Sequence, residues 1–120
     1  MFKEVRRGEI YYVDLTPVVG SEQGGVRPAV ILQNNVGNLH AGTTIIAPTT
    51  TRVKNLLPTH VYIPPFTRGL DLDRGSLVLL EQVRMVSKLR LRECRGICPP
   101  EIMEQINRAL KISLGLEGGE

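Results

Sequence analysis

The residue of this sequence best suited to a chemical role is an arginine at the end of a glycine-rich loop. Arg27 follows the segment GSEQGG (20–25) and precedes Pro28, at the start of an apolar run. The glycines of this segment let another chain approach closely, and the proline restricts the backbone beside Arg27. A guanidinium at such a junction presents paired donors that fit a phosphate. The same spacing fits a structural arginine that pairs with Asp14 or Glu22, so the residues alone leave both interpretations open.

Other familiar catalytic sets are missing from the sequence. The glycine-rich segment is not followed by Gly-Lys-Ser/Thr, so it is no nucleotide-binding loop of that type, and no GxSxG motif of a hydrolase occurs. His40 and His60 are the only histidines, and we expect surface or structural roles for both. Cys94 and Cys98, the only cysteines, cannot supply the four ligands of a zinc site. We therefore expect reduced, semi-buried thiols and neither a metal nor a cofactor.

The charge of the chain favours an anionic partner. Eleven of the fifteen cationic residues are Arg, and up to residue 100 there are thirteen Lys and Arg against eight Asp and Glu. Such a balance suits nucleic acid or an acidic protein segment, although a mixed, solubilising surface explains it equally well. Aromatic residues make up only 4% of the chain, which disfavours a stacking platform for single-stranded nucleic acid.

No segment of the sequence is typical of a secretion signal or a membrane span. The first residues lack the apolar core of a secretion signal, and no apolar run approaches the ~18 residues of a membrane span. We expect a cytoplasmic protein without membrane contact, folded as a single domain over residues 1–120.

The elements that must position Arg27 are short strands followed by one helix. β-Branched and aromatic runs bounded by turn residues predict five strands. Segments 16–25 and 34–42 are rich in Gly, Asn and Ser and predict loops. Pro48 predicts that its strand is an edge strand or contains a bulge. The strands are expected at 9–15, 27–33, 43–50, 60–64 and, as the longest, 76–86.

The segment after Pro99 and Pro100 predicts an amphipathic helix over residues 101–116. Apolar and small residues recur at helical spacing along one face, and prolines are well tolerated in a first helical turn. That face carries Ile102, Ile106, Ala109, Leu110 and Ser113. Short strands at regular spacing followed by such a helix predict a mainly β fold, a small barrel closed off by a C-terminal α-helix.

Five segments resemble one family in order and spacing. RGEIYYVDL (7–15), GSEQGGVRPAVILQN (20–34), PTHV (58–61), LLEQVRMV (79–86) and ALKISLGL (109–116) are similar to the MazF/PemK family of sequence-specific, mRNA-cleaving toxins, above all to its Gram-positive branch. The likeness covers residues 6–116.

The resemblance implies a fold, an activity and partners. The fold would be an SH3-like barrel of the MazF/PemK type with a C-terminal helix, working as a homodimer that binds single-stranded RNA along its interface. The activity would be that of a metal-independent endoribonuclease that leaves 2′,3′-cyclic phosphate and 5′-hydroxyl ends and so inhibits translation. The partner would be a cognate antitoxin with an acidic, partly disordered segment.

The resemblance also implies roles for individual residues. It assigns catalysis to Arg27 and Thr50, and it makes Glu81 an alternative base. Another branch of the family has an Arg two positions before that acidic residue, where this chain has Leu79; an ion pair between Glu81 and Arg84 is the structural alternative. An amide offers a donor and an acceptor together to an exposed base, which suits Gln82. RNA-binding candidates are Ser21, Glu22, Gln23, Gln82 and Arg84.

Two other functions remain open from the sequence. A sibling toxin class shares this barrel but inhibits DNA gyrase through residues of its C-terminal helix. A non-catalytic SH3-like module would bind acidic peptides without any chemistry.

Overall fold

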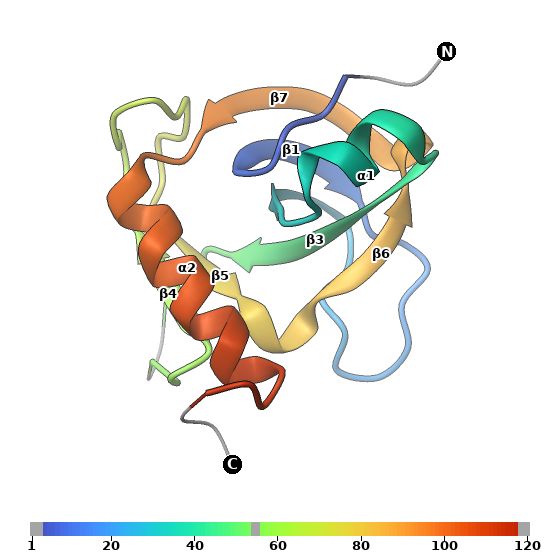
Figure 1. Ribbon diagram of the computed structural model, residues 1–120. Helices are drawn as coiled ribbons and strands as arrows, with labels where there is room; N and C mark the ends of the chain where they lie inside the picture. The colour runs from blue at the N-terminus through green and yellow to red at the C-terminus, as the bar shows by residue number, and fades with distance from the viewer. Residues whose placement is uncertain (1–3, 54–55, 118–120) are drawn as a thin grey trace.

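Seven strands and a long C-terminal helix make up most of the molecule (Figure 1). The structure is a computed structural model and describes residues 4–53 and 56–117. The mainly β fold with a C-terminal helix is therefore confirmed. In chain order the elements are β1 (Glu9–Asp14), β2 (Val26–Ile31), α1 (Asn35–His40), β3 (Thr43–Thr50), β4 (His60–Ile63), β5 (Ser76–Leu79), the 3-10 helix η1 (Leu80–Gln82), β6 (Arg84–Ser87), the 3-10 helix η2 (Lys88–Arg90), β7 (Leu91–Ile97) and α2 (Pro100–Ser113).

The strands form one antiparallel, strongly curved sheet in the order β4-β5-β3-β2-β1-β7 (Figure 1). Strand β6 pairs with β3 outside this order, so β3 has β2 on one side and both β6 and β5 on the other. Within the described ranges no continuous ladder joins β4 to β7, although a single bridge links Leu70 to Gly96. The architecture is a small, incompletely closed barrel.

The prediction of one long strand over 76–86 was wrong, because the structure divides this segment at η1. Strand β5 pairs with the end of β3, where Thr50 faces Leu77, while β6 pairs with its beginning, where Thr43 faces Ser87. A straight strand cannot follow both halves of a curved partner, and η1 supplies the corner. The apolar run SLVLL (76–80) gives no sign of this corner in the sequence, because Leu80 is buried like the strand residues before it.

Of the two alternatives predicted for Pro48, an edge strand or a bulge, the edge strand was wrong, since β3 lies inside the sheet. Pro48 pairs with Ala29 of β2 on one side. On the other side, β6 pairs with residues up to Ile46 and β5 begins pairing at Thr49. The proline thus lies in the gap between two partner strands, where a missing N–H breaks no regular ladder.

Two further elements differ from the sequence prediction. The turn-rich segment 34–42 contains α1, whose first turn is capped by Asn34 Oδ1 accepting from the Gly37 N–H at 2.8 Å. Strand β7 was not predicted at all. Of its residues only Leu91 is buried, so the alternating apolar pattern that identifies a half-buried strand is missing.

Apolar side chains pack on both faces of the sheet. Neighbouring residues of β2 point to opposite faces, with Val30 in the larger cluster and Ile31 in the smaller. The larger cluster lies under α2 and includes Ile102, Ile106 and Ala109. These three residues belong to the predicted apolar face of the helix, which is confirmed; Leu110 packs against the same cluster, and Ser113 Oγ donates to the Leu80 carbonyl at 2.7 Å. In the described part of the chain no helix is long and apolar enough to cross a membrane.

The two cysteines differ in environment, and their reactivity should differ accordingly. Cys94 is exposed, whereas Cys98 is buried in the larger cluster, and burial raises its pKa to about 12. At pH 8 only about one Cys98 side chain in ten thousand is therefore a thiolate, the form that reacts. We expect iodoacetamide to label Cys94 alone in the native protein and both cysteines in denaturant, as read by peptide mass spectrometry. Equal labelling rates in the native protein would contradict the burial of Cys98.

Candidate functional site

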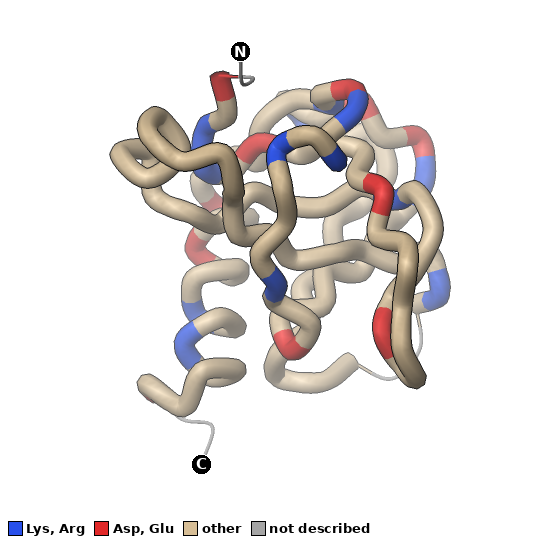
Figure 2. Tube along the Cα trace, turned by 90° about the vertical axis from the view of Figure 1, so that its right-hand side faces the viewer, with Lys and Arg blue, Asp and Glu red and all other residues tan. Residues whose placement is uncertain are grey.

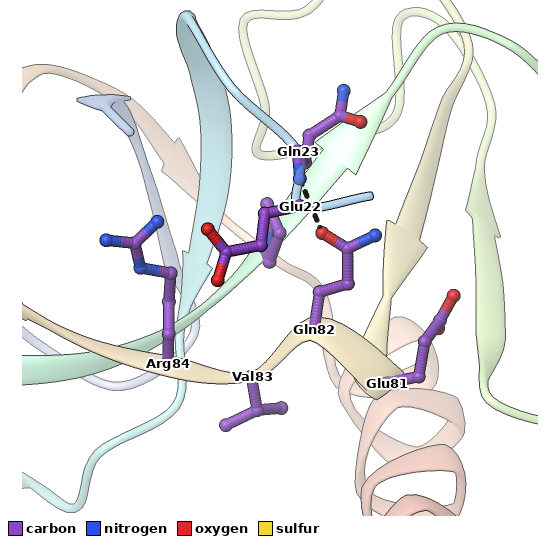
Figure 3. Close-up of a pocket in the computed structure, with 7 residues that line it drawn as sticks. Glu22, Gln23, Glu81, Gln82, Val83 and Arg84 are labelled. Carbon is purple, nitrogen blue, oxygen red and sulfur yellow. Dashed lines mark hydrogen bonds between the residues drawn. The ribbon is translucent and has the colours of Figure 1, made fainter. Parts of the chain in front are cut away.

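A polar pocket of about 330 Å³ opens between the loop that follows β1 and the corner formed by η1 (Figure 3). The loop contributes Glu22 and Gln23, and the chain from η1 into β6 contributes the opposite wall. Five predicted site residues thus lie around one hollow, although the two groups are about 60 positions apart in the sequence. The pocket is lined by Glu22, Gln23, Pro48, Glu81, Gln82, Val83 and Arg84.

One hydrogen bond crosses the pocket and joins its two walls. The backbone N–H of Gln23 donates to Oε1 of Gln82 at 2.7 Å (Figure 3). Both glutamines are half-buried, whereas Ser21 and Glu22 on the same loop are exposed. Ser21 does not line the pocket.

Arg27 lies beside this pocket at the start of β2 and is half-buried. Its Nε donates to the Gly24 carbonyl at 2.6 Å, and among the ion pairs of the described residues none involves Arg27. The structural alternative raised by the sequence was therefore wrong. Glu22 instead accepts from the Val19 N–H at 2.8 Å, and Asp14 lies 3.5 Å from Arg92.

Thr50 is the last residue of β3, the strand that pairs with β2, which carries Arg27. Ala29 pairs with Pro48, and Thr49 Oγ1 donates to the Pro28 carbonyl at 2.7 Å. Continuing this register by two positions places Arg27, the second residue of β2, opposite Thr50, the last residue of β3, on the same face of the sheet. The Thr50 hydroxyl oxygen accepts from the Arg52 N–H at 3.2 Å, and within residues 4–53 and 56–117 its own hydrogen has no acceptor.

Glu81 is held by two residues at the start of β4. Its Oε1 accepts from the Thr59 hydroxyl at 3.1 Å, and its Oε2 lies 2.9 Å from Nε2 of His60. Because His60 Nδ1 accepts from the Leu57 N–H at 3.2 Å, the ring proton is on Nε2 and is donated to Glu81. The alternative of an ion pair with Arg84 was wrong.

His60 and Thr59 were not assigned any site role from the sequence. Both belong to the segment PTHV that carries the family resemblance, which was the available signal. His60 has only 9% of its side chain exposed, so the expected structural role is the one found.

Three arginines fasten the base of the loop that carries Glu22 and Gln23. Arg84 donates to the Leu15 carbonyl at 3.3 Å, Arg90 donates to the carbonyls of Asp14 and Thr16, and Arg92 pairs with Asp14. Hydrogen bonds from Thr16, with a further contribution from Arg92, hold the pKa of Asp14 below its usual value. The sequence predicted that the arginines bind an anionic partner. In the structure, Arg84 and Arg90 instead donate to backbone carbonyls of the protein itself.

Charged positions of both signs are interspersed over the molecule (Figure 2). In residues 4–53 and 56–117 no three His, Cys, Asp or Glu side chains gather as metal ligands. The polar groups that line the pocket are two carboxylates, two amides and a guanidinium. Arg27 and Thr50 add a second guanidinium and a hydroxyl nearby. This set can bind and polarise an anionic group and can accept a proton through a carboxylate.

The chain is similar to known toxins over nearly its whole length. Residues 6–114 match the family described as PemK-like, MazF-like toxin of type II toxin-antitoxin system. The endoribonuclease EndoA of Bacillus subtilis (strain 168) is 46% identical over 113 residues, which cover 93% of this chain and 96% of that protein.

Solved structures give the same result. An endoribonuclease in complex with its cognate antitoxin from Mycobacterial species is 28% identical, with a TM-score of 0.77, and the match covers 95% of this chain and 98% of that one. MazF (Form-I) from Deinococcus radiodurans is 27% identical, with a TM-score of 0.77 and coverage of 94% and 98%. Sequence and fold thus agree, and the chain belongs to the PemK-like, MazF-like toxins of type II toxin–antitoxin systems.

Proposed function

We propose that the protein is a sequence-specific endoribonuclease that cleaves single-stranded mRNA without a metal ion or cofactor, with Arg27 and Thr50 as its catalytic residues. One observation carries the assignment: Arg27, which has no ion-pair partner among the described residues, contacts the pocket residue Gln23 and starts a strand that pairs with the strand ending at Thr50. A fully charged guanidinium and a hydroxyl are the donors that a scissile phosphate needs. The similarity to EndoA, which is named an endoribonuclease, supports the same activity.

The reaction is an internal transesterification. The ribose 2′-oxygen forms a bond to the adjacent phosphorus, and the bond from phosphorus to the 5′-oxygen of the next nucleotide breaks. The 2′-hydroxyl loses its proton and the leaving 5′-oxygen gains one, which gives 2′,3′-cyclic phosphate and 5′-hydroxyl ends. Negative charge grows on the phosphate oxygens in the transition state, and Arg27 and Thr50 stabilise it by donating to them.

Glu81 is the proposed base for the 2′-hydroxyl proton. A guanidinium stays protonated in proteins and is a poor acceptor, so Arg27 does not suit this step. The Glu81 carboxylate lines the pocket, and the Thr59 hydroxyl and His60 Nε2–H fix its orientation. Both oxygens keep lone pairs beyond these bonds.

The remaining polar residues are proposed to bind the RNA around the scissile phosphate. Gln82 Oε1 accepts from Gln23, so its amide nitrogen is the group free to donate to an exposed base. Arg84 spans the end of the pocket and retains guanidinium hydrogens beyond its bond to Leu15. The proposed RNA-binding residues are Ser21, Glu22, Gln23, Gln82 and Arg84.

The proposed partners follow from the family. Solved relatives include an endoribonuclease in complex with its cognate antitoxin and MazE–MazF complexes from Deinococcus radiodurans. We propose a cytoplasmic homodimer that binds RNA along its interface and is neutralised by an antitoxin with an acidic, partly disordered segment. The basic excess of residues 1–100 supports such a partner.

Cleavage in a chelator tests the activity. We expect the purified protein to cut a long in vitro transcript at defined sites in excess EDTA at the rate seen without it. Because Arg27 rather than a metal stabilises the phosphate, the Arg27→Ala variant should leave the transcript intact. End-specific ligation and phosphatase treatment would identify the 2′,3′-cyclic phosphate and 5′-hydroxyl ends.

Three results would contradict the proposal. Loss of cleavage in EDTA that Mg²⁺ restores would show a metal-dependent reaction. Full activity of Arg27→Ala would point to a contaminating nuclease. No cleavage together with inhibition of DNA gyrase would favour the sibling toxin class.

A further inference from the structure

Gln23 directs its side-chain amide at the Arg27 guanidinium. One amide atom lies 2.7 Å from Nε and 2.9 Å from Nη1 of Arg27. This atom is the amide oxygen, since both arginine atoms are donors. With the amide nitrogen in its place two donors would face each other, and only a long bond of 3.4 Å to the Thr49 carbonyl would result.

The backbone of Gln23 is fixed from the other wall of the pocket. Its N–H donates to Gln82 Oε1 at 2.7 Å, and Gln82 belongs to η1, which packs against α2. Gln23 and Gln82 are half-buried, while the preceding loop residues from Thr16 to Glu22 are exposed. A chain of two glutamines therefore connects the packed helical corner to the guanidinium.

These contacts leave the rest of Arg27 available. The carbonyl of Gly24 and the amide oxygen of Gln23 occupy Nε and one hydrogen of Nη1. Nη2 makes no hydrogen bond to any residue within 4–53 or 56–117, and no carboxylate in those ranges pairs with the guanidinium. A neutral amide orients an arginine without neutralising it, which a carboxylate at the same place would do.

We propose that Gln23, anchored by Gln82, is a positioning residue that holds the Arg27 guanidinium with its free nitrogen directed at the scissile phosphate. This inference rests on the proposed ribonuclease function and gives Gln23 a role other than contact with a base. Both amides are neutral, so holding Arg27 in this way adds no negative charge beside its guanidinium.

The test compares Gln23→Met, which keeps the length of the side chain and loses the acceptor, with Gln105→Met on the exposed surface of α2. NMR of the arginine Nε–H groups reports on the contact directly, with the Arg27 signal assigned by its loss in Arg27→Lys. In Gln23→Met we expect this signal to shift and its solvent exchange to accelerate. We expect kcat on a long in vitro transcript to fall about 100-fold, the effect of misplacing a catalytic group by about 1 Å, and KM to rise by a much smaller factor. Gln105→Met should match the wild type in both measurements.

A second variant separates orientation from charge and guards against misfolding. Gln23→Glu keeps an acceptor, so the Arg27 Nε–H signal should stay protected, while its negative charge should weaken binding of the same transcript at least 10-fold at low salt. Binding at wild-type strength would contradict the argument that neutrality matters.

Each of the following outcomes overturns the inference. An unchanged Arg27 signal in Gln23→Met would show that the amide does not hold the guanidinium. A raised KM with unchanged kcat would show that Gln23 contributes to RNA binding alone and does not position Arg27. A wild-type protein that cleaves no RNA contradicts the proposed function and with it the positioning role, whereas an active wild type with an equally active Gln23→Met contradicts the positioning role alone.

Discussion

Replacing Arg27 by Lys is expected to lower kcat for RNA cleavage by a factor of roughly 10² to 10³, the effect of removing one donor from a site that stabilises an oxyanion. Lysine keeps the positive charge but lacks the planar set of donors. One ammonium group cannot bond to the Gly24 carbonyl and the Gln23 amide while also giving two aligned hydrogens to a phosphate. The charge stays in the site, so binding of the transcript should weaken much less than kcat falls.

Steady-state cleavage of a defined transcript would measure this loss, and Arg108→Lys is the matched control. Arg108 is exposed on α2, away from the pocket, and its replacement should leave kcat and KM unchanged. Circular dichroism melting of Arg27→Lys would verify that the fold is intact. Wild-type kcat for Arg27→Lys would show that charge alone suffices and would remove the basis of the proposed mechanism.

The second large effect concerns α2, the helix against which η1 packs. Ile106 is completely buried between α2 and the sheet, in the larger apolar cluster. Truncation to Ala removes three carbons and leaves a cavity that the strands cannot close. We expect Ile106→Ala to lower the free energy of unfolding by about 3 kcal/mol, within the range measured for such changes. For a chain of this size the Tm should fall by about 10 °C.

Thermal and urea unfolding of Ile106→Ala and Gln105→Ala at one protein concentration would measure the difference. Equal concentrations matter because association of two copies would add to the apparent stability. Gln105 precedes Ile106 on α2 but faces solvent, so its replacement should change stability by less than about 0.5 kcal/mol. If Ile106→Ala is no less stable than this control, α2 does not contribute to the core as its packing indicates.

The strands with alternating or continuous apolar residues could be predicted from the sequence to within a few positions. Strand β7 could not, because its side chains after Leu91 are largely exposed and leave no periodic signal. The corner at η1 was concealed for the opposite reason, since Leu79 and Leu80 are buried on both sides of the bend. Periodicity reports burial, and it identifies an element only where burial alternates.

Candidate site residues could be proposed from the sequence, but the contacts between them could not. Arg27 could be proposed from its loop and from the family resemblance, and Glu81 and Gln82 from their motif. The partners of these residues depend on loops that are distant in sequence. Glu81 bonds to His60, 21 positions away, and Gln23 bonds to Gln82, 59 positions away. Such pairings become visible only when the sheet order is known.

These long separations have a consequence for a newly made polypeptide. Contacts between distant segments form slowly, because loop closure must precede any gain from them. The loop bearing Gln23 needs η1, and η1 packs against α2, which follows every strand in the chain. Arg7 is likewise tied to Asn107, 100 positions later. We therefore expect that a growing chain on the ribosome does not complete the site until α2 has emerged.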